Sequence, residues 1–348
     1  MPALSVPSAT APDSQSCPPP TASDGDDPDD DSRAHQDALA ADGLLAPALL
    51  ASASVRVRAE LPETPLVRSE RLGAWLKLEN LQTTGAYKVR GALNALAAQI
   101  ERGDRRPVFA ASAGNHGLGV AWAARRLGLV ATIVVPEDAP LTKVAGARAL
   151  GARVVRAGGG FESCAAHARA LAAGQGGRFL HAFDDADVIA GQSTVGAELL
   201  ALRPDVVVVP IGGGGLIAGV GSVLRRAGIR VVGAQVAGVD ALRRALAHEP
   251  APWPAPAQTL ADGLRVAAPG RLPLRIATAC LDEIVVVEEA EVVAALASLA
   301  LHERVVAEGA GAVAVAALAR VSGGRRAAIV SGGNIDASLL GGLIARAA

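Results

Sequence analysis

Lysine, cysteine and aromatic residues are scarce in this 348-residue chain. Only three of its 33 basic residues are lysines, namely Lys77, Lys88 and Lys143. The three cysteines form no CxxC pair and no ligand cluster with the six histidines, so neither a disulfide scaffold nor a metal site is expected. With 2% aromatic residues and a formal net charge of −1, the chain lacks the features of a general nucleic-acid binder.

Long hydrophobic runs are also missing, although 51% of the residues are hydrophobic. Glu288, Glu289 and Glu291 interrupt one apolar stretch and Glu308 interrupts another, so no run of about 18 apolar residues remains to cross a bilayer. The N-terminus has neither the basic nor the apolar region of a signal peptide. We therefore expect a cytoplasmic protein without a membrane contact.

Residues 1–35 differ in composition from the rest of the chain. They are rich in Pro, Ser, Ala and Asp and offer few bulky apolar groups to offset the entropy lost on ordering. We predict that this segment is a disordered tail, and that the residues after it form the folded part.

Beyond the tail, short β-rich runs alternate with helical patterns. Val206–Val209 is a continuous apolar run, which is typical of a strand covered on both faces. The alternation of strand, glycine turn and helix predicts an α/β protein with parallel sheets. The expected strands are 74–79, 108–112, 130–136, 153–157, 206–211, 230–235 and 327–331, and the expected helices include 117–127, 141–150, 161–173, 194–202 and 216–227.

Lys88 lies in the segment LQTTGAYKVRG, where a turn becomes a helix. A lysine can form a Schiff base with an aldehyde only when its amine is neutral part of the time, and burial or nearby cations favour the neutral form. We expect Arg90 and the N-terminus of the helix to provide part of this positive field. The alternative for Lys88 is a solvated lysine in a first helical turn.

A second feature is the tetraglycine run Gly212, Gly213, Gly214 and Gly215, which joins the expected strand 206–211 to a helix. Glycines allow successive backbone N–H groups to converge on an anion, and the helix dipole adds to the attraction. The run fits neither a dinucleotide nor a nucleoside-triphosphate motif. A reactive lysine together with a phosphate loop predicts a carbonyl cofactor that bears a phosphate, and pyridoxal phosphate fits this description.

A third turn, SAGNHG at residues 112–117, also joins a strand to a helix. Alone it is a weak signal, because Ser and Asn are common helix caps. Parallel sheets place ligands at the carboxyl ends of their strands, and all three turns follow strands or begin helices at such ends.

Together the three segments resemble the pyridoxal-phosphate enzymes of fold type II, and they are most similar to threonine/serine dehydratases (ammonia-lyases) and serine racemases. The similarity runs from about Leu61 to Leu340. It implies the two-domain fold also found in the β-subunit of tryptophan synthase, usually as a homo-oligomer. The smaller domain would span residues 107–184, inserted into a larger one made of residues 36–106 and 185–348. We expect no C-terminal regulatory domain, as in the short dehydratases.

The resemblance also implies roles for individual residues. Lys88 would bind the cofactor covalently and act as the catalytic base, and the four glycines would hold its phosphate. Asn115 would contact the phenolic oxygen of the cofactor, and Ser331 its pyridine nitrogen. A hydroxyl partner does not hold this nitrogen protonated, which favours β-elimination over transamination. The substrate carboxylate would be bound by Ser112, Gly114, Asn115 and His116, although a packed histidine is an equal alternative for His116.

Further positions indicate which reaction is expected. Serine racemases carry a second serine as an opposite-face acid/base where this chain has Ala113, and a metal-ligating glutamate where it has Gln235. The resemblance therefore implies dehydration of L-threonine and/or L-serine to a 2-oxo acid and ammonia. Ala86 and Leu118 depart from the usual pattern and leave the side chain of the amino-acid substrate open. Glu308 is either a residue near the cofactor or a helix cap, and Asp262 and Gly263 shape the site.

Two alternatives remain open from the sequence. One is a dehydratase of another 3-hydroxy amino acid, such as 3-hydroxyaspartate. The other is a non-catalytic regulatory protein that binds pyridoxal phosphate.

Overall fold

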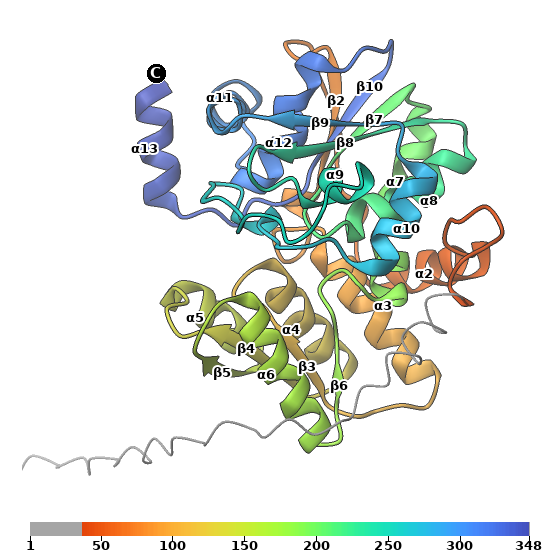
Figure 1. Ribbon diagram of the computed structural model, residues 1–348, viewed down its shortest axis with the longest axis vertical. Coiled ribbons are helices and arrows are strands. Elements are labelled where there is room, and N and C mark those ends of the chain that lie inside the picture. Colours follow the sequence, from red (N-terminus) through yellow and green to blue (C-terminus); the bar gives the residue numbers. More distant parts are fainter. Residues whose placement is uncertain (1–36, 348) are drawn as a thin grey trace, which may run out of the picture.

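The computed structural model describes residues 37–347, so the predicted disordered tail, residues 1–35, lies outside the described part. Two sheets organise the described residues, each flanked by helices (Figure 1). The predicted α/β class with parallel sheets is confirmed.

The larger sheet has six strands in the order β1-β2-β10-β7-β8-β9. All neighbouring pairs are parallel except the hairpin of β1 and β2. Val206 and Val208 of β7 face one hydrophobic core, and Val207 and Val209 face the other, so helices cover the sheet on both sides. The strands are β1 (Leu66–Ser69), β2 (Ala74–Leu78), β7 (Val206–Pro210), β8 (Arg230–Val236), β9 (Glu283–Val287) and β10 (Arg326–Val330).

The smaller sheet has four parallel strands in the order β5-β4-β3-β6. It lies below the larger sheet in the view of Figure 1, with α4, α5 and α6 around it. Its strands are β3 (Val108–Ala111), β4 (Ala131–Pro136), β5 (Arg153–Ala157) and β6 (Arg178–Phe179).

The helices follow the strands as the sequence pattern predicts. The α-helices are α2 (Pro47–Glu60), α3 (Lys88–Glu101), α4 (Asn115–Leu127), α5 (Leu141–Ala149), α6 (Phe161–Gly174), α7 (Ala186–Leu199), α8 (Gly215–Arg226), α9 (Ala241–Leu246), α10 (Arg271–Cys280), α11 (Glu289–Ser298), α12 (Gly309–Ala317) and α13 (Ala337–Ala347). Short turns are η1 (Glu79–Leu81), η2 (Leu200–Leu202), η3 (Asp262–Leu264), η4 (Leu299–Glu303) and η5 (Leu318–Arg320). Within the described residues, no helix combines the length and apolar character needed to cross a membrane.

The predicted elements agree with the structure apart from their ends, with one larger error. The helix expected at 194–202 is wrong at its start, since α7 begins at Ala186. Asp185 caps α7, because its side chain accepts a hydrogen bond from the backbone N–H of Val188. The polar residues Gln192, Ser193 and Thr194 do not end the helix, because they are buried within its interior turns.

Candidate active site

A cleft of about 700 Å³ lies between the two sheets at the carboxyl ends of their strands. Turns after β3, β7 and β10 line it, and the start of α3 closes one side. The structure brings together every residue that the sequence analysis assigned to the site: Lys88, Ser112, Gly114, Asn115, His116, Gly212, Gly213, Gly214, Gly215 and Ser331 all line this cleft.

Lys88 is the first residue of α3, and its half-buried side chain places the amine in the cleft. The Lys88 Nζ donates a hydrogen bond to the carbonyl oxygen of Ala182 at 3.0 Å and lies 5.3 Å from the ring centre of Tyr87. Burial lowers the pKa of Lys88 from 10.5 to about 8, and the nearby Glu308 carboxylate partly opposes this shift. Roughly a tenth of the amine is therefore neutral at pH 7, compared with well under a hundredth for an ordinary lysine.

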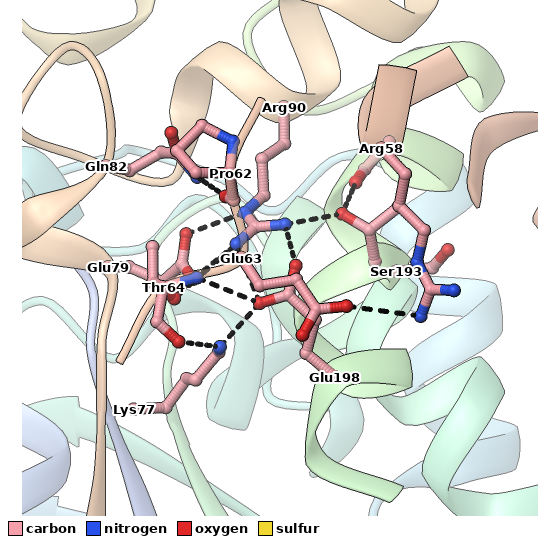
Figure 2. Close-up of polar contacts among 12 residues, drawn as sticks. Arg58, Pro62, Glu63, Thr64, Lys77, Glu79, Gln82, Arg90, Ser193 and Glu198 are labelled. Carbon is pink, nitrogen blue, oxygen red and sulfur yellow. Dashed lines mark hydrogen bonds and ion pairs between the residues drawn. The ribbon is translucent and has the colours of Figure 1, made fainter. Parts of the chain in front are cut away.

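The expectation that Arg90 adds a positive field at Lys88 is wrong. Arg90 lies two residues further along α3, but its guanidinium is fully buried in an ion cluster with Glu79 and Glu198 (Figure 2). Two carboxylates compensate its charge, so desolvation, rather than a neighbouring cation, lowers the pKa of Lys88.

Lys77 completes this buried ion cluster, which we define as Lys77, Glu79, Arg90 and Glu198. The Arg90 Nε lies 2.8 Å from Glu79 Oε2, and the Arg90 Nη1 lies 2.5 Å from Glu198 Oε1. The Lys77 Nζ lies 2.5 Å from Glu198 Oε2 and also donates to the carbonyl oxygen of Thr64 at 2.7 Å. Two cations and two carboxylates thus join β2, η1, α3 and α7 without a net charge.

The tetraglycine loop connects β7 to α8 and faces the cleft. Gly214 has φ +94°, a conformation that side-chain-bearing residues rarely adopt, and a Cβ atom on Gly213 would lie 2.5 Å from the ring of Phe183. The first turn of α8 also has N–H groups without a partner inside the helix, as any helix N-terminus does. The loop therefore presents its backbone amides in a form that suits a phosphate.

The side chain of Asn115 is held in one orientation by two other residues. The Asn334 amide donates to the Thr84 carbonyl and to Asn115 Oδ1, each at 2.8 Å. The Asn115 Nδ2 donates to Glu308 Oε1 at 2.6 Å. The oxygen of Asn115 is already hydrogen-bonded, whereas one hydrogen of its Nδ2 group is still free among the described residues. Asn115 can therefore act as a hydrogen-bond donor in the cleft.

Glu308 is the N-cap residue of α12 by position, yet its side chain makes no capping hydrogen bond and instead accepts from Asn115. Burial raises the pKa of Glu308 to about 7, the Asp262 carboxylate adds to this shift, and the Asn115 hydrogen bond opposes it. The carboxyl group therefore lies in the cleft close to a half-protonated state at neutral pH.

His116 is buried in the first turn of α4, and its Nε2 lies 3.2 Å from the carbonyl oxygen of Leu180. A carbonyl only accepts, so Nε2 carries the proton, and Nδ1 has no partner among the described residues. Burial lowers the pKa of His116 to about 3, with a further contribution from Lys88. His116 is therefore neutral and offers an acceptor, not an acid, at the wall of the cleft.

The two serines of the site already have local contacts. The Ser112 Oγ accepts a hydrogen bond from the Gly114 N–H at 3.0 Å, which fixes the turn before α4. The Ser331 Oγ donates to the carbonyl oxygen of Ala310 at a longer 3.3 Å. Ala113, between Ser112 and Gly114, lines the cleft with a methyl group and no ionisable group.

These residues fit pyridoxal phosphate. The cleft has the volume of a small-molecule site, and it combines a desolvated lysine amine with a glycine loop at a helix N-terminus. Asn115 supplies a fixed N–H donor and Ser331 a hydroxyl at the end of β10. The fold and the site together define the class of pyridoxal-phosphate enzymes with a parallel-sheet core.

Comparison with known proteins gives the same class. Residues 57–332 match the family model described as "Pyridoxal-phosphate dependent enzyme", and the chain belongs to this family. It is 43% identical over 277 residues to an L-threonine ammonia-lyase of Thermotoga maritima, covering 78% of this chain and 69% of the relative.

Solved structures are similar as well. A threonine deaminase of T.th. has a TM-score of 0.79 and 37% identity, covering 84% of this chain and 99% of the other. Maize serine racemase has a TM-score of 0.79 and 30% identity, covering 86% of this chain and 97% of the other. The chain is thus an enzyme of this family, and pyridoxal phosphate is its cofactor.

Several residues of the cleft did not stand out in the sequence. Asn334 follows Ser331 by three residues, but the sequence gave no signal of its contact with Asn115. Phe183 covers the glycine loop, and the Lys143–Asp262 ion pair, 3.0 Å long, joins α5 to η3 beside the cleft. Each contact joins segments far apart in the chain, so no local pattern could have indicated it.

Proposed function

We propose that this enzyme converts L-threonine and/or L-serine into a 2-oxo acid and ammonia by β-elimination of the hydroxyl group. The observation that carries the proposal is the buried Lys88 amine, which is partly neutral and faces a cleft with the donors that pyridoxal phosphate requires. The names of the similar proteins, L-threonine ammonia-lyase and threonine deaminase, support the same reaction.

The bound cofactor would withdraw electrons from the substrate and so weaken its Cα–H bond. The Lys88 amine then takes the Cα proton as general base, since desolvation keeps part of it neutral. The hydroxyl group leaves Cβ with a proton as water, and a water molecule adds later when ammonia is released, so threonine yields 2-oxobutyrate and ammonia.

The remaining residues of the site position these groups. The N–H groups at the start of α4, beside Ser112 and Gly114, suit the substrate carboxylate because a helix N-terminus attracts anions. Asn115, held by Asn334 and Glu308, would donate its free N–H to the phenolic oxygen of the cofactor. The tetraglycine loop would hold the cofactor phosphate, and the Ser331 hydroxyl would contact the pyridine nitrogen.

Racemisation is disfavoured by the wall of the cleft at Ala113. A racemase needs an acid/base on the face opposite Lys88, and a methyl group supplies none. The buried His116 does not replace it, because its low pKa keeps the imidazole neutral.

A second candidate substrate is 3-hydroxyaspartate. Arg265 lines the cleft with an exposed side chain and forms no ion pair among the described residues. A guanidinium in this position suits a second carboxylate on the substrate.

The test is to incubate the purified enzyme with L-threonine, L-serine and 3-hydroxyaspartate and to measure the 2-oxo acid and ammonia formed. Release of 2-oxobutyrate from threonine is the expected result. Turnover of 3-hydroxyaspartate alone would transfer the assignment to the second candidate, and no turnover of any of the three by the cofactor-loaded protein would contradict dehydration.

We also propose that residues 107–184 form a smaller domain inserted between residues 36–106 and 185–348. The four strands of the smaller sheet, which all lie within residues 108–179, support this division. The family resemblance further supports a cytoplasmic homo-oligomer, which size-exclusion chromatography with light scattering would test.

A further inference from the structure

A second cavity, of about 440 Å³, lies at the end of the six-stranded sheet where β2, β7 and β10 begin, whereas the active-site cleft lies where these strands end. Ala74, Val206 and Arg326 are the first residues of β2, β7 and β10, and the cavity is built where these strands begin. In Figure 1 this is the upper end of β2 and β10, away from the smaller sheet. The strands are about five residues long, so the two cavities are separated by roughly 15 Å of sheet.

The cavity is lined mainly by arginines. Arg68, Arg203, Arg325 and Arg326 surround it, together with one carboxylate, Asp205, and one aromatic side chain, Trp75. This concentration of positive charge is notable in a chain whose formal net charge is −1.

The charge of the cavity is not compensated by its single carboxylate. Asp205 forms no ion pair among the described residues, and its Oδ2 accepts instead from the backbone N–H of Arg325 at 2.6 Å. Arg68 lies 3.2 Å from Glu70, but both side chains are exposed, so this pair is weak. The four arginines thus outnumber the carboxylates near them by two to one.

Two of the arginines are held in place by groups without charge. The Arg326 guanidinium donates to four backbone carbonyls, those of Leu72, Gly73, Leu318 and Val321, at 2.9–3.3 Å. Arg325 Nη1 donates to the carbonyls of Leu202 and Arg203. Carbonyl oxygens carry no charge, so these guanidiniums are ordered without being neutralised, and part of the cost of ordering an anion site is already met by the fold. Because both Nη groups of Arg326 are used by carbonyls, Arg326 contributes charge to the cavity rather than hydrogen bonds to an anion.

Arg203 lies at the rim of the cavity, shortly before β7. It ends η2 as its C-cap residue, in the left-handed conformation common at helix ends. Its exposed side chain forms no ion pair among the described residues, so its charge is available to an anion in the cavity.

We propose that this cavity binds a phosphate-bearing anion of the size of a diphosphate or an organic phosphate. Arginine guanidiniums match phosphate oxygens in pairs, and the volume exceeds what one inorganic ion fills. The site would be separate from the cofactor phosphate site, which lies at the opposite ends of the same strands.

The test is calorimetric titration of the cofactor-saturated enzyme with pyrophosphate, so that the tetraglycine loop is already filled. We expect saturable binding that weakens as sodium chloride is added, and a rise in the unfolding temperature with pyrophosphate. The double substitution Arg68→Gln and Arg203→Gln should weaken binding at least about tenfold, since it removes two charge-assisted contacts.

Arg125→Gln is the matched control, because Arg125 is an exposed arginine of α4 outside both the six-stranded sheet and this cavity. It should bind pyrophosphate as the unmodified enzyme does. The proposal is overturned if the unmodified enzyme shows no saturable binding, or if the double variant, with an unchanged unfolding temperature in the absence of ligand, binds as tightly as the control. These measurements do not depend on which amino acid the enzyme dehydrates.

Discussion

The buried ion cluster and the active-site cleft hold the two lysines with the most contrasting environments in the chain. Lys77 is buried and Lys88 is half-buried; Lys77 meets a carboxylate at 2.5 Å, whereas the hydrogen bond of the Lys88 amine goes to the Ala182 carbonyl. The cleft amine therefore loses part of its proton, and the cluster amine is held in an ion pair. Burial alone does not make a lysine reactive; burial without a paired carboxylate does.

The contrast extends to the first turn of α3, which contributes to both regions. Lys88 faces the cleft and Arg90, two residues later, faces the ion cluster on the other side of the helix. Because β2, η1 and α7 all contribute charged groups around Arg90, the cluster fixes the helix that carries Lys88. We infer that one region supplies rigidity and the other supplies chemistry, and the following substitutions test that division.

The largest effect is expected for Lys88→Ala. Removing the general base and the covalent attachment point should lower turnover about 10⁴-fold or more, with loss of the visible absorbance of the bound cofactor. The unfolding temperature of the cofactor-free protein should not fall, because no ion pair is lost. Ammonia release and absorbance spectra check both points.

Lys143→Ala is the control for this substitution, since Lys143 lines the same cleft but is paired with Asp262 at its edge. It should cost less than about tenfold in turnover, as expected for an exposed ion pair. An active Lys88→Ala enzyme would refute the assignment of the base.

Arg90→Met should lower the stability of the protein, whereas Lys88→Ala lowers its turnover. It leaves Glu79 and Glu198 buried with one cation fewer, and breaking a buried ion pair from one side costs about 3–5 kcal/mol of unfolding free energy. Urea denaturation followed by circular dichroism measures this loss. Arg102→Met, at the exposed end of the same helix, should cost about 1 kcal/mol or less. Equal losses in the two variants would show that the cluster contributes no rigidity.

A third prediction concerns the pH dependence of stability. Burial holds His116 neutral, with a folded-state pKa of about 3 against 6.5 for the free side chain. Because the folded-state pKa is depressed, the contribution of His116 to the free energy of unfolding is complete above pH 6.5. It is lost progressively as the pH falls towards 3, by about 1 kcal/mol between pH 6.5 and 5.5. His116→Asn should flatten this slope in urea denaturation. His302→Asn, a change at an exposed histidine, should not.

The residues predicted for the site line one cleft, and each could be chosen because it lies within a local pattern. Glycine turns after apolar strands mark the carboxyl edge of a parallel sheet, so Gly212 and Ser112 could each be placed at the carboxyl edge of a sheet without knowing the packing. The contacts that decide the chemistry are not local. Asn115 and Glu308 are 193 residues apart, and Arg90 and Glu198 are 108 apart. For this reason the field around Lys88 was wrongly assigned to Arg90, whose partners only the fold reveals.

The same limit applies to the strands. The edge strands β1, β6 and β9 were not predicted. β1 and β6 are short and lack a continuous apolar run, whereas β9 has the apolar run 284–287 but is only half-buried. The central strand β7 was predicted nearly to the residue because both of its faces are buried. The half-exposed edge strand β5 was predicted as well, so burial on both faces helped at β7 but was not required for every strand.

Glu308→Gln should have the smallest effect and tests how a carboxylate in the cleft changes the pKa of Lys88. The glutamine oxygen can still accept from Asn115, so the orientation of Asn115 is kept while the carboxyl group that titrates at about pH 7 is lost. Without this carboxylate, which raises the pKa of Lys88, the amine becomes neutral at lower pH. The pH midpoint for covalent attachment of pyridoxal phosphate to the cofactor-free protein, followed by absorbance, should fall by about half a unit or more. An unchanged midpoint would mean that Glu308 only shapes the cleft. A fall would show that the Glu308 carboxylate holds the Lys88 amine partly protonated, and so acts weakly on Lys88 in the way that the paired Glu198 acts on Lys77.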